Sequence, residues 1–532
     1  MDFSDSDNSN SIENIDEENF INNKHGFLLN YNRLKQIFSS DIKQNICKIK
    51  IELKDGNIDF TNGFFCYIPS KGMTILITNY HAIDQNYLDN KKEINYIIEN
   101  NDNKEEERTI SLKTKRFIIS DKELDTIIIE ILDEDNIEYF FEFDENFIQN
   151  KELKYEKIFS IYFKKEQNLT VAFGRILDCS GNFIKINIGD EPDSFGSPII
   201  TIDGMKIIGL HRGGLNTLGD IKKQNLGVIL DKIIGIIPKE NYSMNNNVIK
   251  CTYYIKKEDI NKDINVYYNS HNIRDKIKKV IINGEEEDKE NLKNGIYRFN
   301  KEGKYFFCYH FDNTLNDLSH MFSNCSSLTW VFIPSFSFLE NKITNLSKLF
   351  YECFALKKIH FSSSFNTEDV MDMSRMFTNC QSLKSINLSS FNTKNVQDMS
   401  FMFDSCINLQ QIDLSSFNTR NVYYMSSLFD GCTKLKYIDL SSFNTEKVKD
   451  MSNMFHGCSS LKKLNLSNFK ICNVNNMKSM FGYCSSLKEI DLTSFQTNEI
   501  VYLTNMFKKC SSLKSIKCND KKINDEFEKL VL

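Results

Sequence analysis

The sequence predicts a multidomain protein in which an all-β domain, a small β-rich unit and an α/β solenoid follow one another. Three observations predict this class: many short apolar runs in the first half, a repeat in the second half, and a length of 532 residues, enough for roughly three domains of about 150 residues. The net charge of −6 with 41% hydrophobic residues excludes a basic nucleic-acid-binding protein and a wholly disordered chain. No apolar run approaches the roughly 18 residues of a membrane-spanning helix.

The N-terminal segment, residues 1–26, is predicted to be a disordered acidic tail. Its first 20 residues contain seven acids and no base, which is the reverse of a secretory signal. Without such a signal, a chain with 15 cysteines is expected in the reducing cytoplasm, where thiols are not joined in disulfides.

Residues 27–240 are predicted to form an all-β domain. Short β-rich runs such as GFFCYI, MTILITN, TIIIEIL and TVAFGRIL are separated by turns, and few segments have helical periodicity. So many short strands indicate a sandwich or a pair of barrels. The charged segment Glu99–Thr109 is expected to be a surface loop. Residues 248–317 alternate apolar and charged residues, and we expect a small β-rich unit there that caps the first coil of the solenoid.

Three landmarks follow one another in the predicted all-β domain. His81 comes directly after an apolar strand, Asp125 stands at the start of another strand 44 residues later, and PDSFGSPII leads into GMKIIGLHRGG. This order resembles the chymotrypsin-like (trypsin-type) serine proteases, particularly their glutamyl-endopeptidase-like branch, over about 210 residues. The resemblance implies a double barrel, with His81 as the catalytic base and Asp125 as the acid that orients it. It also implies that His211 helps to select an acidic side chain in the specificity pocket.

The chain departs from this family at the nucleophile. The family motif GxSGSP places the serine three residues before the proline, and this position holds Phe195. The family glycine two residues earlier is Asp193, whose carboxylate would oppose the negative charge that develops in the transition state. The domain is therefore predicted to be a pseudoprotease. The open alternative is that Ser194 or Ser197 reaches His81 through a shifted turn.

A sequence repeat organises residues 318–518, which contain eight units. One cysteine recurs in each unit, at steps of 28, 27 and then 26 residues. A period of about 20–29 residues with leucines in phase indicates a leucine-rich solenoid, whose units must stack to bury their apolar faces. The recurring cysteines are Cys325, Cys353, Cys380, Cys406, Cys432, Cys458, Cys484 and Cys510.

Within the unit formed by residues 383–408, two apolar patterns follow each other. Leu383, Ile386 and Leu388 suit a short strand, and apolar residues from Val396 to Cys406 recur at helical spacing. Each unit is therefore expected to contain a strand and a helix, and residues 519–532 are expected to form a C-terminal tail. A cysteine that recurs once per coil is interpreted as a small core residue, although isolated disulfides between adjacent coils are conceivable.

The sequence predicts neither a metal nor a cofactor. No repeat contains CxxC, and the chain has no HExxH, no glycine-rich phosphate loop and no dinucleotide fingerprint.

The repeats resemble the BspA-like leucine-rich repeat family, whose units read LxxLDLSxFxTxxVxxMxxMFxxC, over about 200 residues. Members are usually surface or adhesion-type proteins. The resemblance therefore implies a protein-binding array, and it makes the cell surface or a secreted location the alternative to the cytoplasm.

The outward positions of the predicted strands form two polar columns, lysines in one and Asn or Asp three residues further along. Such positions build a continuous surface on a solenoid, commonly the binding face. The alternative is a solvated face that only keeps the array soluble. The candidate binding residues are Lys384, Asn387, Lys436, Asp439, Lys462, Asn465, Lys488 and Asp491.

Two functions follow from these patterns. The first is a non-enzymatic interaction protein that binds a protein or peptide through the repeats. The alternative is a serine endopeptidase with a displaced serine, whose repeats recruit the substrate. Neither function involves nucleic acid or a transmembrane segment.

Overall fold

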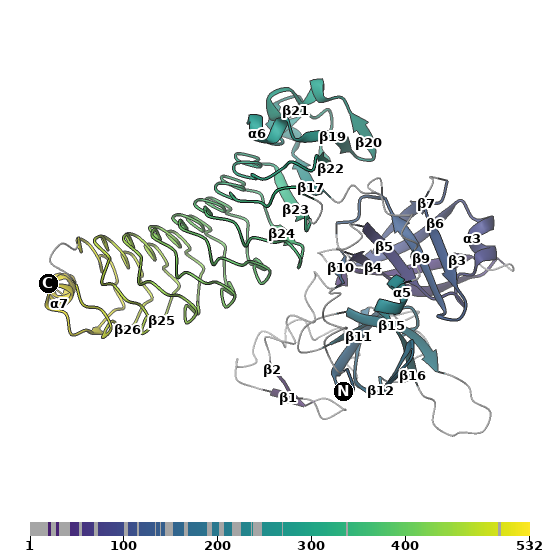
Figure 1. Cartoon of the computed structure of the whole chain (residues 1–532), viewed down its shortest axis with the longest axis horizontal. Coiled ribbons are helices and arrows are strands. Elements are labelled where there is room, and N and C mark those ends of the chain that lie inside the picture. Colours follow the sequence, from purple (N-terminus) through teal and green to yellow (C-terminus); the bar gives the residue numbers. More distant parts are fainter. Residues whose placement is uncertain are drawn as a thin grey trace. The chain divides into compact units, whose positions relative to one another are not determined.

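The computed structural model describes residues 20–22, 28–30, 43–52, 56–68, 73–99, 105–113, 116–132, 135–138, 140–143, 153–163, 169–188, 194–201, 207–214, 225–235, 237, 247–268, 270–336, 339–497 and 502–531. The chain divides into two compact units, Met1–Ser243 and Met244–Leu532 (Figure 1). Most of the predicted acidic tail lies outside the described residues. Its described part, β1 (Phe20–Asn22), is a strand that pairs with β2 (Leu28–Asn30).

The first half of unit 1 is an open eight-stranded sheet in the order β7-β6-β3-β4-β5-β9-β8, with β10 beside β4. The segment Glu99–Thr109, expected to be a loop, instead ends β6 and forms most of β7, which pair as a hairpin. The elements are β3 (Ile46–Glu52), β4 (Ile58–Ile68), β5 (Met73–Thr78), α3 (Gln85–Asn90), β6 (Glu93–Glu99), β7 (Glu105–Ser111), β8 (Ile118–Asp121), β9 (Thr126–Ile131) and β10 (Phe141–Glu142).

The second half of unit 1 is a closed six-stranded barrel in the order β11-β12-β13-β16-β15-β14. The all-β prediction is confirmed, but among the described residues only this half closes into a barrel. One apolar core joins the two halves, since Phe64 and Ile128 of the sheet belong to the same buried cluster as Phe159 and Leu210 of the barrel. The elements are β11 (Lys157–Phe163), β12 (Leu169–Ser180), β13 (Phe183–Ile186), β14 (Pro198–Thr201), β15 (Ile207–Gly214), β16 (Asn225–Ile229) and α5 (Leu230–Gly235).

Unit 2 begins with a six-stranded sheet in the order β20-β19-β22-β17-β23-β24. Strand β17 pairs with β23, which belongs to the first repeat, and β23 pairs in parallel with β24 of the second. The sheet therefore continues from the β-rich unit into the coils. The elements are β17 (Val248–Ile255), η4 (Lys257–Asp259), β18 (Asp263–Asn265), α6 (His271–Arg274), β19 (Ile277–Ile282), β20 (Glu285–Glu287), η5 (Lys289–Gly295), β21 (Ile296–Arg298), β22 (Gly303–Phe311), β23 (Leu328–Ile333) and β24 (Lys358–Phe361).

The repeats wind into stacked coils (Figure 1). A parallel bridge joins the same position of successive coils, at Asp317, Asn345, Asp372, Asp398, Tyr424, Asp450, Asn476 and Tyr502. Near the C-terminal end, three short parallel strands form a further sheet: β25 (Lys463–Asn465), β26 (Glu489–Asp491) and β27 (Ser515–Lys517).

The helix expected in each unit is absent from the described residues of the repeats. Backbone N–H groups there alternate between two kinds of partner: Phe401 donates to Ser426 in the next coil, and Met402 donates to Met399 three residues back. This alternation places Phe401 and Ser405 at φ of 59° and 58°, a left-handed conformation that breaks a helix. Apolar residues three or four apart therefore lie on successive tight turns, and the α/β expectation is wrong for the described repeats.

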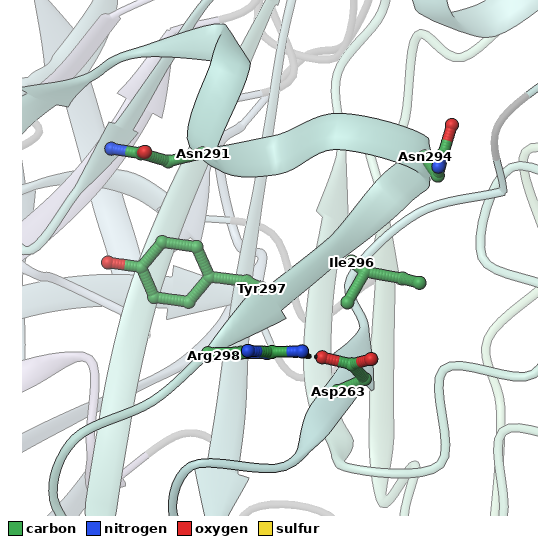
Figure 2. Close-up of a pocket in the computed structure, with 6 residues that line it drawn as sticks. All are labelled: Asp263, Asn291, Asn294, Ile296, Tyr297 and Arg298. Carbon is green, nitrogen blue, oxygen red and sulfur yellow. Dashed lines mark hydrogen bonds and ion pairs between the residues drawn. The ribbon is translucent and has the colours of Figure 1, made fainter.

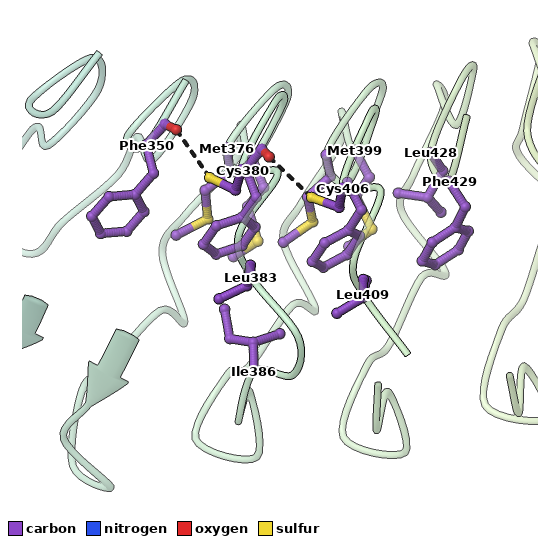
Figure 3. Packing of buried hydrophobic residues seen from close by; sticks show 14 of the residues in the cluster. Phe350, Met376, Cys380, Leu383, Ile386, Met399, Cys406, Leu409, Leu428 and Phe429 are labelled. Atoms are coloured by element: carbon purple, nitrogen blue, oxygen red, sulfur yellow. Dashed lines mark hydrogen bonds between the residues drawn. The ribbon is translucent and has the colours of Figure 1, made fainter. Parts of the chain in front are cut away.

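The recurring cysteines form a buried column next to a column of stacked phenylalanine rings (Figure 3). They are thiols without disulfides, which confirms the packing interpretation. Every one of these thiols after Cys325 also donates to a backbone oxygen in the preceding coil: Cys406 Sγ lies 3.2 Å from Phe377 O, and Cys432 Sγ lies 3.1 Å from Phe403 O. The cysteines thus link adjacent coils as well as filling the core.

The C-terminal segment covers the last coil with α7 (Lys521–Val531). Ile523 is fully buried, and the ring of Phe527 packs edge-on against Phe507 at 5.7 Å. The carboxylate of Asp520 accepts hydrogen bonds from the N–H and hydroxyl of Thr497. In other coils the next repeat satisfies such groups, so this segment ends the stack. In the part of the chain that the structure describes, no helix has the length and apolar character of a membrane span.

Candidate active site and repeat surface

His81 and Asp125 meet at one end of the open sheet. His81 follows β5 by three residues, Asp125 directly precedes β9, and these two strands are paired neighbours. The carboxylate accepts from His81 twice, with Oδ2 2.7 Å from Nδ1 and Oδ1 2.8 Å from the backbone N–H. Asn79 Nδ2 lies 3.3 Å from the same Oδ2. The side chain of Asp125 is 9% exposed and that of His81 is 46% exposed, so the imidazole faces solvent from a fixed support.

Arg212 also approaches this carboxylate, with Nε 3.9 Å from Asp125 Oδ2. Its guanidinium lies over the ring of Phe183, 5.1 Å from the ring centroid. A cation beside Asp125 offsets part of the negative charge that would stabilise a protonated imidazole at His81. The sequence places Arg212 next to the family position of His211, but it contains no signal that predicts this contact.

Phe195 fills the place beside the imidazole. Its ring packs edge-on against His81 at 5.6 Å and against His211 at 5.9 Å between ring centroids. Asn62 Nδ2 lies 3.3 Å from the backbone oxygen of Phe195, and Asn62 Oδ1 accepts the N–H of Phe163 at 2.7 Å. Asn62 therefore ties the turn to both halves of unit 1. Sequence reasoning missed this residue, because one asparagine in a strand gives no functional signal.

The two serines proposed as replacements are buried and bonded elsewhere. Ser194 Oγ lies 2.9 Å from His211 Nδ1, and Ser197 Oγ lies 2.6 Å from Ser160 Oγ. Ser197 also donates to the backbone oxygen of Ser194. In the described part of the chain, the hydrogen bonds of both hydroxyls go to residues other than His81. The structure therefore brings His81 and Asp125 together, and it bonds the two serine hydroxyls to His211 of β15 and Ser160 of β11.

The turn that carries Phe195 has little freedom to shift. Gly196 has φ of +80°, and a Cβ there would lie 2.0 Å from the backbone oxygen of Asn62. Its N–H donates to His211 O at 3.0 Å. Asp193, the other departure from the protease motif, lies outside the described residues.

In this pair, the carboxylate of Asp125 can hold the imidazole of His81 in the orientation of a general base and can stabilise the protonated imidazole. His211 is buried behind Phe195 and hydrogen-bonded to Ser194. No group of three or more potential metal ligands occurs in the described part of the chain.

The predicted binding columns lie on the outer side of the coils. The four lysines Lys384, Lys436, Lys462 and Lys488 are exposed, as are Asn387, Asp439 and Asn465, while Asp491 is half-buried. The Asn and Asp column has a structural role that the sequence did not predict. Each of its side-chain oxygens accepts the backbone N–H two residues later, as in Asp439 to Ser441 at 2.9 Å and Asp491 to Thr493 at 3.0 Å. These residues therefore fix the turn that ends each strand.

Two cavities lie in unit 2. One of about 520 Å³ is lined by Asn291, Asn294, Tyr297, Ile296 and the ion pair of Asp263 with Arg298, but its side chains point in different directions (Figure 2). The other, of about 380 Å³, crosses four coils and is lined mainly by uncharged polar residues, with Met371 and Tyr423. Neither cavity contains a converging set of catalytic groups.

The repeats match a family described as "Mycoplasma protein of unknown function, DUF285", over residues 316–437 and 408–520. No curated protein matches the chain in sequence. Among solved structures, the chain is similar to the MamO protease domain of Magnetospirillum magneticum (9% identity, 37% of this chain, 98% of that chain, TM-score 0.28). It is also similar to Deg5 (15%, 40%, 94%, 0.29) and to the catalytically active tobacco etch virus protease (17%, 38%, 80%, 0.26).

Proposed function

We propose that this chain is a non-enzymatic protein-binding protein, in which a trypsin-like domain without a nucleophile is joined to a leucine-rich repeat solenoid. The observation that carries the proposal is the ring of Phe195 against His81. Nucleophilic catalysis needs a hydroxyl within about 3 Å of the imidazole nitrogen, and a phenyl ring has no such group.

The two nearby serines do not supply a substitute in this geometry. For either hydroxyl to reach His81, Ser194 would have to leave His211, or Ser197 would have to leave Ser160. The backbone would also have to shift at Gly196, where the oxygen of Asn62 leaves no room. These costs add, so we assign the domain a binding or scaffolding role.

The repeats support the binding half of the proposal through their surface. Parallel bridges hold successive coils in register, Lys384, Lys436, Lys462 and Lys488 are exposed, and the stack is covered at its C-terminal end by α7. A solenoid of this kind offers a long continuous surface to a partner.

One observation favours the alternative, an active serine endopeptidase that uses a displaced serine. The 2.7 Å contact of His81 with Asp125 is the geometry that a catalytic histidine requires. In that alternative the repeats recruit the substrate and His211 favours an acidic side chain.

A fluorophosphonate probe separates the two functions. We expect the full chain to remain unlabelled, and we expect the double variant Phe195→Ser with Asp193→Gly to gain labelling that His81→Ala abolishes. Phe195→Ala is the matched control, because it opens the same space without adding a nucleophile and should remain unlabelled.

Labelling of the unaltered chain that disappears both in His81→Ala and in Ser194→Ala or Ser197→Ala would establish the endopeptidase and contradict the proposal. No labelling of the double variant would contradict the claim that Phe195 and Asp193 are what the site lacks.

A further inference from the structure

The last coils of the array carry an excess of positive charge. The whole chain has a net charge of −6, but residues 318–518 contain 21 basic and 15 acidic residues. All of this excess lies in residues 458–518, which hold nine bases and three acids. The charge is therefore concentrated at one end of the stack and not spread over it.

Four lysines form a row along the stack, three of them in this region and one in the coil before it, and we call them the lysine row: Lys436, Lys462, Lys488 and Lys514. Three of them directly precede β25, β26 and β27, whose parallel register aligns them, and the N–H of Lys488 donates to Lys462 O. Lys436 holds the same place one coil earlier. Adjacent strands lie about 4.8 Å apart, so the row places like charges at that interval.

The lysine row has no counterion among the described residues, where none of its four members forms an ion pair. Lysines one or three positions further along the strands are paired, as Lys463 with Glu489 and Lys517 with Asp491, both at 3.8 Å. Exposed like charges at this spacing repel one another. A bound anionic group at each lysine would remove that repulsion.

The column of Asn and Asp residues, with Lys517 at its last place, runs beside the lysine row, three residues further along each coil. It includes Asp439 and Asp491, and hydrogen bonds from Ser441 and from Thr493 hold the pKa of these two carboxyl groups below the ordinary value. Three residues of strand correspond to about 10 Å. The strip that favours an anion is therefore narrow, and beside two of the four lysines it is bounded by negative charge.

We infer that the lysine row binds an extended acidic segment of a protein partner, an inference that rests on the protein-binding role proposed above. An extended chain running along the stack places side chains of one face about 7 Å apart, a spacing that the flexible lysine stems can follow over 4.8 Å steps. Acidic side chains on that face pair with the lysines, and neutral residues lie against Asp439 and Asp491. A wide polyanion such as a nucleic acid or a sulfated glycan would bring its negative charge close to Asp439 and Asp491, and these carboxylates would repel it.

The test uses the full chain and a fluorescein-labelled 15-residue peptide with glutamate at every second position, alternating with glycine or serine. Its partner peptide has glutamine at every glutamate. We expect binding of the first by fluorescence anisotropy, and a loss of about 30-fold in the variant Lys436→Gln, Lys462→Gln, Lys488→Gln and Lys514→Gln, since each exposed pair contributes a factor of roughly two to two and a half.

A matched control removes the same charge elsewhere on the repeats. The variant Lys394→Gln, Lys447→Gln, Lys470→Gln and Lys478→Gln alters four exposed lysines outside the row, and it should change affinity less than about twofold. Equal losses in the two variants would show attraction to net charge alone and overturn the inference. Row-dependent binding of heparin or of single-stranded DNA, without binding of the peptide, would overturn the assignment of an acidic protein.

A displayed random 12-residue peptide library separates this inference from the proposed function. Enrichment of acidic sequences that the row variant no longer selects supports both. Enrichment of sequences without acids, unchanged in the row variant, overturns the lysine row as the site and leaves protein binding intact. No enrichment from the library, together with no binding of the glutamate peptide, overturns both.

Discussion

Replacing Cys406 by alanine or by serine separates packing from hydrogen bonding in the cysteine column. Cys406 is fully buried, and its thiol lies 3.2 Å from the backbone oxygen of Phe377. Alanine removes both the sulfur atom and the donor. Serine also removes the sulfur, but it keeps a donor at nearly the same place.

The expected losses differ by a measurable amount. Removing one buried atom the size of a methyl group costs about 1 kcal/mol. The oxygen of Phe377 keeps a second partner, the N–H of Cys380 at 3.0 Å, so the lost thiol bond adds only about 0.5–1 kcal/mol. We therefore expect the free energy of unfolding to fall by about 1.5–2 kcal/mol in Cys406→Ala and by about 1 kcal/mol in Cys406→Ser.

Urea unfolding of the full chain, followed by circular dichroism, measures this difference as a shift in the midpoint of the transition assigned to the repeats. Midpoints are compared because a repeat array does not unfold in one step. Cys472→Ala is the matched control, since Cys472 is exposed and its loss should stay within about 0.5 kcal/mol. A serine variant less stable than the alanine variant would refute the hydrogen-bond argument and leave packing as the column's only role.

Two further predictions concern the same coils. Stability should decline as pH rises above about 9, because burial raises the pKa of the column thiols, to about 11 for Cys510, while unfolded thiols ionise near their ordinary value of 9.0. The contribution is complete below pH 9 and is lost above it, so urea midpoints that stay level from pH 8 to 10.5 would contradict this. Thr419→Val should cost about 1–3 kcal/mol, because the buried hydroxyl donates to Asn444 O at 2.9 Å and accepts the N–H of Asn444 at 2.8 Å. Hydrogen exchange at the Asn444 amide should quicken, whereas Thr433→Val, with a more exposed hydroxyl, should leave it unchanged.

The protease-like site was predicted in part. The pairing of His81 with Asp125 was expected from the resemblance to the chymotrypsin-like proteases, and β5 and β9, at whose ends these residues lie, are paired although three strands separate them in the sequence. The contacts of Asn62 and Arg212 could not be predicted, because each depends on a residue more than 80 positions away in the sequence. No local sequence pattern indicates a contact between residues so far apart in the chain.

The helix predicted in each repeat shows where periodicity misleads. Apolar residues three and four apart are typical of a helix, but tight turns that alternate with left-handed residues give the same spacing. Glycine holds one left-handed position in two described coils, at Gly431 and Gly457, whereas residues such as Asn379, Ser405 and Tyr483 hold it in others. The hydrogen bonds to the next coil hold these residues in place, and a single unit does not reveal them.

The sequence by itself determined the order of the parts, the period of the coils, the residues that form the buried columns and the presence of phenylalanine at position 195. These features depend on residue type and spacing alone. The tertiary structure decided which groups the buried polar atoms contact: Ser194 faces His211, the thiols link successive coils, and the Asn and Asp column fixes turns. The first two are contacts between residues 17 or more positions apart, so they arise only when the chain folds. The lysine row stays without such a partner in the described chain, and this is why we look for its partner in another protein.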